Sequence, residues 1–89
     1  MPSVLVDYSL QFCARFETST RYYILRCSRD LFGDLVVSRH WGSKLSRLGG
    51  QRHEPQPSLE AALRLIGKLI RIRDRRGYRA VSQSKTKED

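Results

Sequence analysis

The stretch RYYILRCSRDLFGDLVVSRHWG, residues 21–42, predicts two β-strands joined by a tight turn. Its first part, residues 21–28, is rich in the aromatic and β-branched residues that favour strands. Gly33 supplies the turn, and residues 35–41 form the second strand. Along the first strand, one face is predicted to carry Tyr23, Leu25 and Cys27, and the other Tyr22, Ile24 and Arg26. This hairpin predicts an antiparallel sheet as the base of the fold.

Further strands are predicted on both sides of the hairpin. Residues 3–16 alternate imperfectly between apolar and polar, and we expect a bulge near Phe12 to shift the phase. After the hairpin, a short strand at residues 51–54 is ended by prolines, and residues 78–81 form a final strand. Residues 82–89 lack apolar side chains and are predicted to form a flexible polar tail. The strands therefore form one antiparallel sheet.

One helix is predicted at residues 59–76. Ser58 is a favourable N-cap, Glu60 places a negative charge in the first turn, and Gly77 ends the helix. The helical period groups one apolar stripe that we expect to pack on the sheet, formed by Leu59, Ala62, Leu63, Ile66, Leu69 and Ile70. One sheet covered by one helix is an α+β fold, with residues 1–81 as its single domain.

The charge of the chain limits the partners that we expect. Its 89 residues include 17 Lys and Arg against 9 Asp and Glu, which gives a net charge of +8. This excess is larger than solubility requires, and its usual partners are nucleic acid or an anionic membrane surface. The alternative is a small basic protein that binds nothing specific.

Neither a membrane span nor a signal peptide is predicted, because no long apolar run and no basic start with a cleavage site are present. Cys13 and Cys27 have neither a zinc spacing nor a disulfide framework. If the first two strands pair, these cysteines could lie close together, but two reduced cysteines are favoured over a disulfide. We therefore expect a cytoplasmic protein without a metal or another cofactor.

The segment from Trp41 to Arg52 combines the only tryptophan with glycines and purely basic charge. With the preceding residue Arg39, its candidate nucleic-acid contacts are Trp41, Gly42, Lys44, Arg47 and Arg52, which we expect to form one exposed surface. Glycines let a partner approach the backbone, basic side chains reach phosphate oxygens, and an exposed indole stacks on a base or sugar. The alternative, equally supported by composition, is that Trp41 packs into the sheet.

The stretch at residues 21–42, followed by GGQRHE and by one helix ending in RRGY, resembles the WGR domain. This family is named for a Trp-Gly-Arg signature. It occurs beside the catalytic domain of poly(ADP-ribose) polymerases and as small stand-alone bacterial proteins, which often carry a turn similar to DLFG at residues 30–33. The resemblance covers about residues 4–81 and implies a sheet of about five antiparallel strands with one helix packed across it.

The resemblance also implies roles for individual positions. In the polymerases the signature tryptophan packs against the end of a DNA strand at a break, which corresponds to Trp41 here, and Gly42 matches the signature glycine. The basic residue that contacts the DNA backbone there corresponds to Arg52. Ser43 replaces the signature arginine, which serves contacts between domains in the polymerases, and Leu45 replaces a glycine. The loss of that arginine fits a chain without a catalytic part.

A basic stripe on the outer face of the helix is a second candidate for phosphate contact, formed by Arg64, Lys68, Arg71 and Arg75. A charged outer face is ordinarily just solvated, and this alternative is the stronger one. What favours phosphate contact by part of the stripe is the absence of an acid between Glu60 and Asp74.

Catalytic chemistry is not predicted. His40 and His53 flank the Trp-Gly segment, but neither lies in a metal-ligand spacing, and no nucleophile elbow is present. The carboxylates are scattered along the chain without a paired spacing. We therefore expect no catalytic residues and no enzyme.

These patterns together predict a nucleic-acid-binding module, for DNA before RNA, that contacts the backbone or the ends with little sequence specificity. The alternative is a protein-interaction module that docks a partner domain through the WGR surface. A docking surface normally carries less charge and more aromatic residues than this segment, which favours nucleic acid. Binding of the helix to an anionic membrane ranks last, because the core needs the apolar face of the helix.

Overall fold

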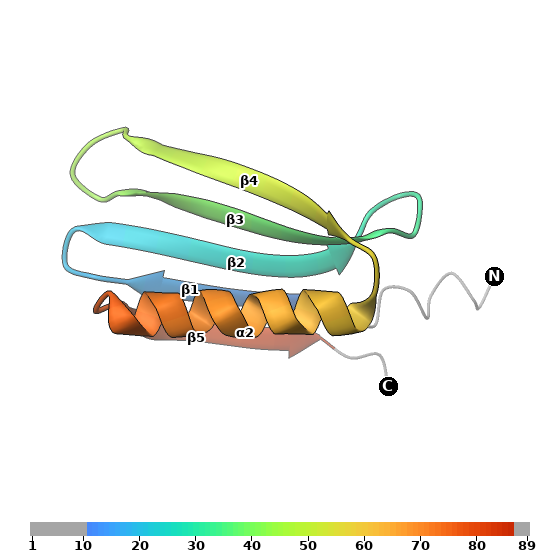
Figure 1. The fold of residues 1–89 in the computed structure, drawn as a ribbon. Coiled ribbons are helices and arrows are strands. Elements are labelled where there is room, and N and C mark those ends of the chain that lie inside the picture. The colour runs from blue at the N-terminus through green and yellow to red at the C-terminus, as the bar shows by residue number, and fades with distance from the viewer. Residues whose placement is uncertain (1–10, 87–89) are drawn as a thin grey trace.

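The computed structural model describes residues 11–86, with side-chain environments up to Ser82. Its elements, in chain order, are β1 (Gln11–Glu17), β2 (Arg21–Arg29), β3 (Leu35–Ser43), β4 (Gly49–Gln56), α2 (Leu59–Arg75) and β5 (Arg79–Thr86). The strands form one antiparallel sheet in the order β4-β3-β2-β1-β5. The helix lies across one face of the sheet, in front of β1 and β5 in the view of Figure 1, and it also contacts β3 and β4. The predicted α+β fold is therefore confirmed.

Side-chain hydrogen bonds shape the two hairpin turns that precede β3. Between β1 and β2, the Thr18 hydroxyl accepts from the backbone N–H groups of Thr20 (3.2 Å) and Arg21 (2.9 Å). Between β2 and β3, Gly33 has a φ of 84°, a left-handed conformation that glycine adopts without strain. The predicted hairpin is thus confirmed, and its strands extend through Arg29 and Ser43.

The core lies between α2 and the face of the sheet that the helix covers, called here the helix-side face. The sheet contributes the buried side chains of Ala14, Phe16, Tyr23, Leu25, Cys27, Leu35 and Val37. Of the predicted faces of β2, the one with Tyr23, Leu25 and Cys27 is therefore the buried one. The helix adds Ala62, Ile66 and Leu69. Burial of this apolar surface is the main term that stabilises so small a domain.

The helix begins where the sequence predicts and ends one residue earlier, at Arg75. The Ser58 hydroxyl accepts from the backbone N–H of Ala61 at 3.1 Å, which confirms the N-cap. Gly77, with a φ of 86°, follows the C-cap Arg76. The chain then turns back into β5.

The predicted apolar stripe of the helix is only partly correct. Ile66 is buried as predicted, but Leu63 is 56% exposed and Leu59 is 40% exposed. Ile70 is half-buried, and Leu65 packs against the core instead. Leu65 widens the apolar arc on its other side, and the periodicity alone does not fix which part of a wide arc faces the sheet.

The prediction of a bulge near Phe12 is wrong. The pairing of β1 with β2 is unbroken from Phe12 to Glu17, and the alternation continues through the buried Ala14 and Phe16. The small side chain of Ala14 blurred the pattern without shifting it. The irregularity lies instead between Arg15 and Phe16, where β1 pairs with β5. The remainder of the predicted first strand, residues 3–10, lies outside the described residues.

Both later strands are longer than predicted. β4 begins at Gly49 and continues through Pro55, which an edge strand tolerates because one side of it needs no N–H donor. β5 continues beyond Val81 to Thr86 and pairs with β1, so the backbone of residues 82–86 is ordered in the sheet and is not a flexible tail. Polar side chains do not prevent a backbone ladder at a sheet edge. Residues 87–89 lie outside the described residues.

The cysteines lie on opposite faces of the sheet. Phe12 is the cross-strand partner of Cys27, so the neighbouring Cys13 points away from it. Both thiols are free, and burial raises the pKa of Cys27. No helix in the described part of the chain has the length and apolar character that crossing a membrane needs.

Candidate nucleic-acid interface

A groove of about 1010 Å³ lies beside the C-terminal end of α2, on the uncovered part of the helix-side face. One wall is the end of the helix, with Arg73 and Arg76, and the other is β3 with its loop to β4. Trp41 and Arg39 come from β3, because residues two apart on a strand share a face. The groove therefore joins an aromatic side chain to guanidinium groups from separate elements.

Trp41 is neither buried in the core nor free in solvent. It lies opposite Gly50 in the ladder, and its residue is 37% exposed. A Cβ at Gly50 would lie only 2.7 Å from Cζ2 of the indole, so the ring packs directly on the β4 backbone. Gly50 is thus needed for this close approach, and the indole keeps exposed surface along the groove.

Arg73 stacks between two tyrosine rings on the groove wall. Its guanidinium carbon lies 4.2 Å from the ring centroid of Tyr23 and 4.9 Å from that of Tyr78. Such cation–π contacts fix the guanidinium plane, and each contributes about 0.5–2 kcal/mol. The helix end is thereby tied to the sheet, and a positive charge is held at a defined place.

Three polar groups that line this groove are buried without a hydrogen-bond partner among the described residues: Tyr23 Oη, Arg39 Nε and Arg73 Nε. Buried polar groups in proteins are almost always paired, so three without a partner among the residues of one groove are unusual. Burial raises the pKa of Tyr23, and the nearby Arg39 guanidinium offsets this only in part. The phenol therefore keeps its proton at neutral pH and is a donor.

Arg39 and Arg52 are direct cross-strand partners on β3 and β4. Two like charges in this position repel each other, but Glu54 lies between them. Its Oε2 accepts from Arg39 Nη2 at 2.5 Å and from Arg52 Nε at 2.7 Å. One carboxylate neutralises only one of the two guanidiniums, so the trio remains positive. The structure thus brings Arg39, Trp41 and Arg52 together on one face, as predicted.

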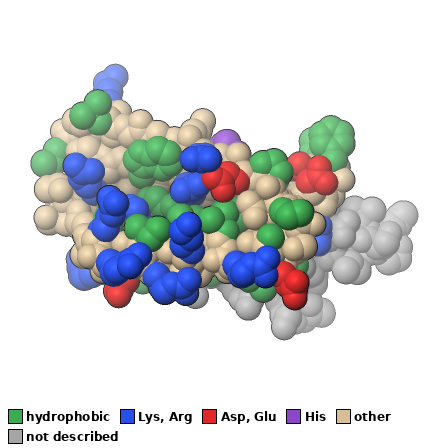
Figure 2. Space-filling model, in the orientation of Figure 1, with side chains coloured by type: hydrophobic (Ala, Val, Ile, Leu, Met, Phe, Trp, Pro, Cys, Tyr) green, Lys and Arg blue, Asp and Glu red, His purple; other side chains and the backbone are tan. Residues whose placement is uncertain are grey.

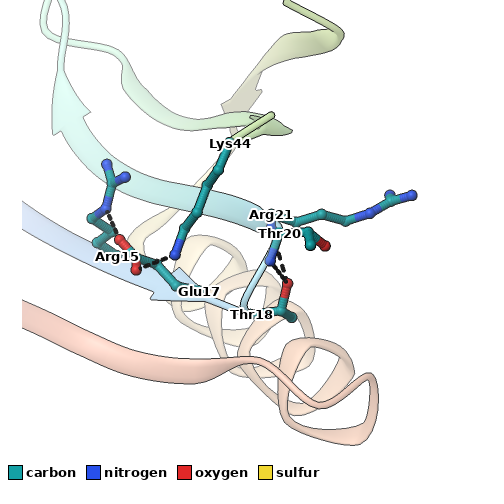
Figure 3. A network of polar contacts seen from close by, with 6 residues as sticks. All are labelled: Arg15, Glu17, Thr18, Thr20, Arg21 and Lys44. Atoms are coloured by element: carbon teal, nitrogen blue, oxygen red, sulfur yellow. Dashed lines mark hydrogen bonds and ion pairs between the residues drawn. The ribbon is translucent and has the colours of Figure 1, made fainter. Parts of the chain in front are cut away.

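Lys44 does not lie on this face, so the prediction of one shared surface is wrong for it. Its Nζ lies 2.7 Å from Glu17 Oε1, and Glu17 Oε2 also pairs with Arg15 Nε at 2.7 Å (Figure 3). This network lies on the far face of the sheet, where Arg15 stacks on Tyr22. Lys44 and Arg15 together lower the pKa of Glu17 to about 2. Strand periodicity did not predict the face on which Lys44 lies, because Lys44 follows the end of β3.

Gly42 lines the groove, whereas Arg47 does not. Gly42 is buried, and a Cβ there would lie 2.7 Å from the Tyr22 hydroxyl on the far face. Its lack of a side chain serves packing. Arg47 is exposed in the loop between β3 and β4, beside Leu45 and Leu48, which are each 78% exposed.

The basic stripe of the helix is exposed along its whole length, as a helix side opposite the core must be. Figure 2 shows Lys and Arg side chains gathered over this face. Arg64 and Lys68 are remote from the groove lining, whereas Arg71 and Arg75 line a second cleft, between α2 and β5. The stripe is therefore not part of the groove.

Sequence reasoning missed the residues that complete the groove, above all Tyr23, Arg73, Tyr78 and Arg76. One pattern pointed to Arg73, since it follows Leu69 by four positions and Ile66 by seven. An arginine in line with buried apolar residues is expected to have an aromatic or charged partner.

The described residues hold no group of three His, Cys, Asp or Glu side chains placed to bind a metal ion. His40 and His53 lie edge to face, with ring centroids 5.9 Å apart, and His53 Nδ1 is 2.8 Å from the Ser38 hydroxyl. Both belong to the far face, away from the groove.

Comparison with known proteins gives one match. No match was found among proteins of curated function or among solved structures. The model of the WGR domain family matches residues 6–85, nearly the whole chain. In the described residues, the sheet with one helix and the tryptophan near the end of β3 agree with the resemblance that the sequence gives. The chain belongs to the WGR domain family.

Proposed function

We propose that this chain is a nucleic-acid-binding module, and not an enzyme, that holds the sugar-phosphate backbone of DNA in the groove beside the end of α2. The observation that carries the proposal is the set of buried, unpartnered donors of Tyr23, Arg39 and Arg73 next to the half-exposed Trp41. Membership of the WGR family supports it, because the family is often linked to nucleic-acid binding.

The groove chemistry suits a phosphate. The three donors belong to residues that line the groove, Arg76 lines it as well, and Arg52 is the cross-strand partner of Arg39. Charge-assisted hydrogen bonds from guanidinium to phosphate are short and strong. The open edge of Trp41 is placed to stack on a base or sugar, a contact of about 1–3 kcal/mol for a base. None of these groups distinguishes one base from another, so we expect little sequence specificity.

The second candidate is docking of a protein partner in the same groove. The observation that favours it is the pair of leucines in the adjoining loop, Leu45 and Leu48, which are each 78% exposed. An apolar partner surface would cover them. Against this, unpartnered guanidinium donors are a poor match for an apolar partner, because burying them unpaired destabilises the complex.

The experiment is a salt series of binding to blunt duplex, nicked duplex, single-stranded DNA and RNA, measured by fluorescence anisotropy. Arg76→Ala should weaken binding to all sequences and lower the slope of log affinity against log salt by about 0.9 on duplex DNA. Arg52→Ala should likewise weaken binding and lower this slope. Trp41→Ala should weaken binding with little change in the slope, because stacking releases no counterions.

Arg64→Ala is the matched control, since it removes the same charge from the same helix outside the groove. It should leave the slope nearly unchanged. An equal loss of affinity in Arg64→Ala and Arg76→Ala would indicate that nucleic acid binds the helix stripe instead of the groove. The absence of salt-dependent binding to every probe would favour a protein partner and refute the proposal.

A further inference from the structure

The turn between β2 and β3 presents two large apolar side chains to solvent. Leu31 is 93% exposed and Phe32 is 87% exposed, more than any other large apolar residue among those described. Isolated exposed apolar residues are common, but two adjacent ones on a protruding turn are typical of a contact site. Residues 30–34 are called here the Leu-Phe turn.

The Leu-Phe turn is held in one shape. The Asp30 carboxylate accepts from the backbone N–H groups of Phe32 and Asp34, both at 2.9 Å. The Arg29 guanidinium donates to the Gly33 carbonyl at 2.8 Å, and Gly33 takes a left-handed φ of 84°. A turn held by its own hydrogen bonds loses little conformational entropy when it binds. Its exposed side chains are therefore prepared for insertion into a partner.

A cleft on the same molecule fits such side chains. It lies between α2 and β5, on the other side of the helix from the groove, and its volume is about 470 Å³. This volume is in the range that proteins use to hold ligands. Its apolar lining is formed by Phe16, Ile70, Tyr78 and Ala80. We call it the α2–β5 cleft.

Charge is complementary between the turn and the cleft. Asp30 and Asp34 flank the two apolar residues, in a chain whose net charge is +8. Neither forms an ion pair with another described residue, whereas Glu17 and Glu54 are each paired twice. The cleft carries Arg71 and Arg75 against one acid, Asp74, so its lining is net positive.

We propose that the Leu-Phe turn of one copy inserts into the α2–β5 cleft of a second copy. Leu31 and Phe32 then cover the apolar lining, and the two aspartates face Arg71 and Arg75. A second copy is the occupant that the charges favour, because the acidic turn and the basic cleft belong to the same chain.

The positions of turn and cleft dictate the form of this assembly. The turn lies at the end of the sheet where α2 begins, and the cleft is built from the end of α2, at the other end of the molecule (Figure 1). A copy therefore cannot fill its own cleft. The contact is heterologous, so each added copy leaves one free turn and one free cleft, and copies join head to tail. An insertion of two side chains buries less than a standard interface of about 1,200–2,000 Å², so free copies associate weakly.

The test is sedimentation equilibrium of the free protein, without nucleic acid, up to about 1 mM, where contacts of millimolar strength are visible. About 0.15 M salt screens the general repulsion between copies. The mean mass of the wild type should rise with concentration. Leu31→Ser with Phe32→Ser should stay monomeric, as should Ala80→Glu, which fills the cleft and repels the aspartates. Leu63→Gln, which changes another exposed apolar residue outside the cleft, should behave as the wild type.

An equimolar mixture of the two defective variants decides the geometry. The double serine variant keeps its cleft and Ala80→Glu keeps its turn, so the mixture should form a one-to-one dimer and grow no further. A monomeric wild type at the highest concentration would overturn the proposal. So would association that persists unchanged in the double serine variant, or a closed dimer that either variant forms alone.

Discussion

Glu54 lowers the positive charge beside the groove that we propose for nucleic acid, so removal of its charge should strengthen binding. The Glu54 carboxylate lies 2.7 Å from Arg52 Nε and also accepts from Arg39, so it neutralises one of the two guanidinium charges. Glu54→Gln keeps the size and an oxygen acceptor while it removes the negative charge. Both guanidiniums then become available to phosphate, and the repulsion between Glu54 and a bound phosphate disappears.

The size of the effect follows from this geometry. A phosphate on the outer side of the guanidinium lies about 7 Å from the carboxylate, where a unit charge contributes about 0.6 kcal/mol in water, about threefold in affinity. One additional neutralised phosphate steepens the slope of log affinity against log salt by about 0.9 on duplex DNA. The gain should therefore be about 3.5-fold larger at about 50 mM than at about 200 mM salt.

The assay is fluorescence anisotropy with a labelled duplex over that salt range, with thermal unfolding to show that the variant is folded. Glu60→Gln is the matched control, because it makes the same charge change in the first turn of α2, far beyond a screening length from the groove. It should leave the slope unchanged. Weaker binding by Glu54→Gln, or an unaltered slope, would refute the assignment of Arg39 and Arg52 to phosphate contact.

Two further predictions concern stability. Ile66→Ala should lower the free energy of unfolding by about 2–5 kcal/mol, because it leaves a cavity against the sheet. Leu63 is 56% exposed, so Leu63→Ala should lower it by less than about 1 kcal/mol. Similar losses for the two variants in urea unfolding would contradict the observed helix phase. Glu17 has a pKa lowered from 4.5 to about 2, so its ion pairs stabilise the fold fully above pH 4.5, and this contribution is lost as the pH falls toward 2. Denaturant titrations of the wild type and Glu17→Gln should therefore show a gap that is constant at neutral pH and closes over that acidic range, and a gap independent of pH would show that Glu17 is not paired in solution.

The hairpin and the helix of this fold could be predicted because their determinants are local. Alternating residues on β2 and the cap at Ser58 depend only on neighbours in the chain. The ends of the outer strands could not be predicted this way. β5 continues over polar residues such as Ser82 because β1 supplies hydrogen bonds from far away in the sequence, and no side-chain pattern records that.

In the candidate site, too, local patterns predicted some residue positions and contacts distant in sequence determined the others. Strand alternation correctly placed Arg39 with Trp41, and the return of the next strand brought Arg52 beside them. The position of Lys44 depended on an acid in β1, Glu17, that only the folded sheet brings near. The role of Arg73 depends on its contacts with two tyrosines from other elements. These are Tyr23 in β2 and Tyr78 in the segment before β5. Contacts between elements that are distant in sequence decided both cases.

The two proposed interaction sites share one geometric cause. Five strands about 4.8 Å apart span about 19 Å, whereas a helix with its side chains is about 10–12 Å wide. A single helix therefore leaves part of the helix-side face open on each of its flanks. On the flank of β3 and β4 the open strip carries Arg39, Arg52 and Trp41, and on the flank of β5 it carries the small Ala80. Because α2 separates the two openings, a second copy seated in the α2–β5 cleft leaves the groove free, and the two proposed contacts can form on the same molecule.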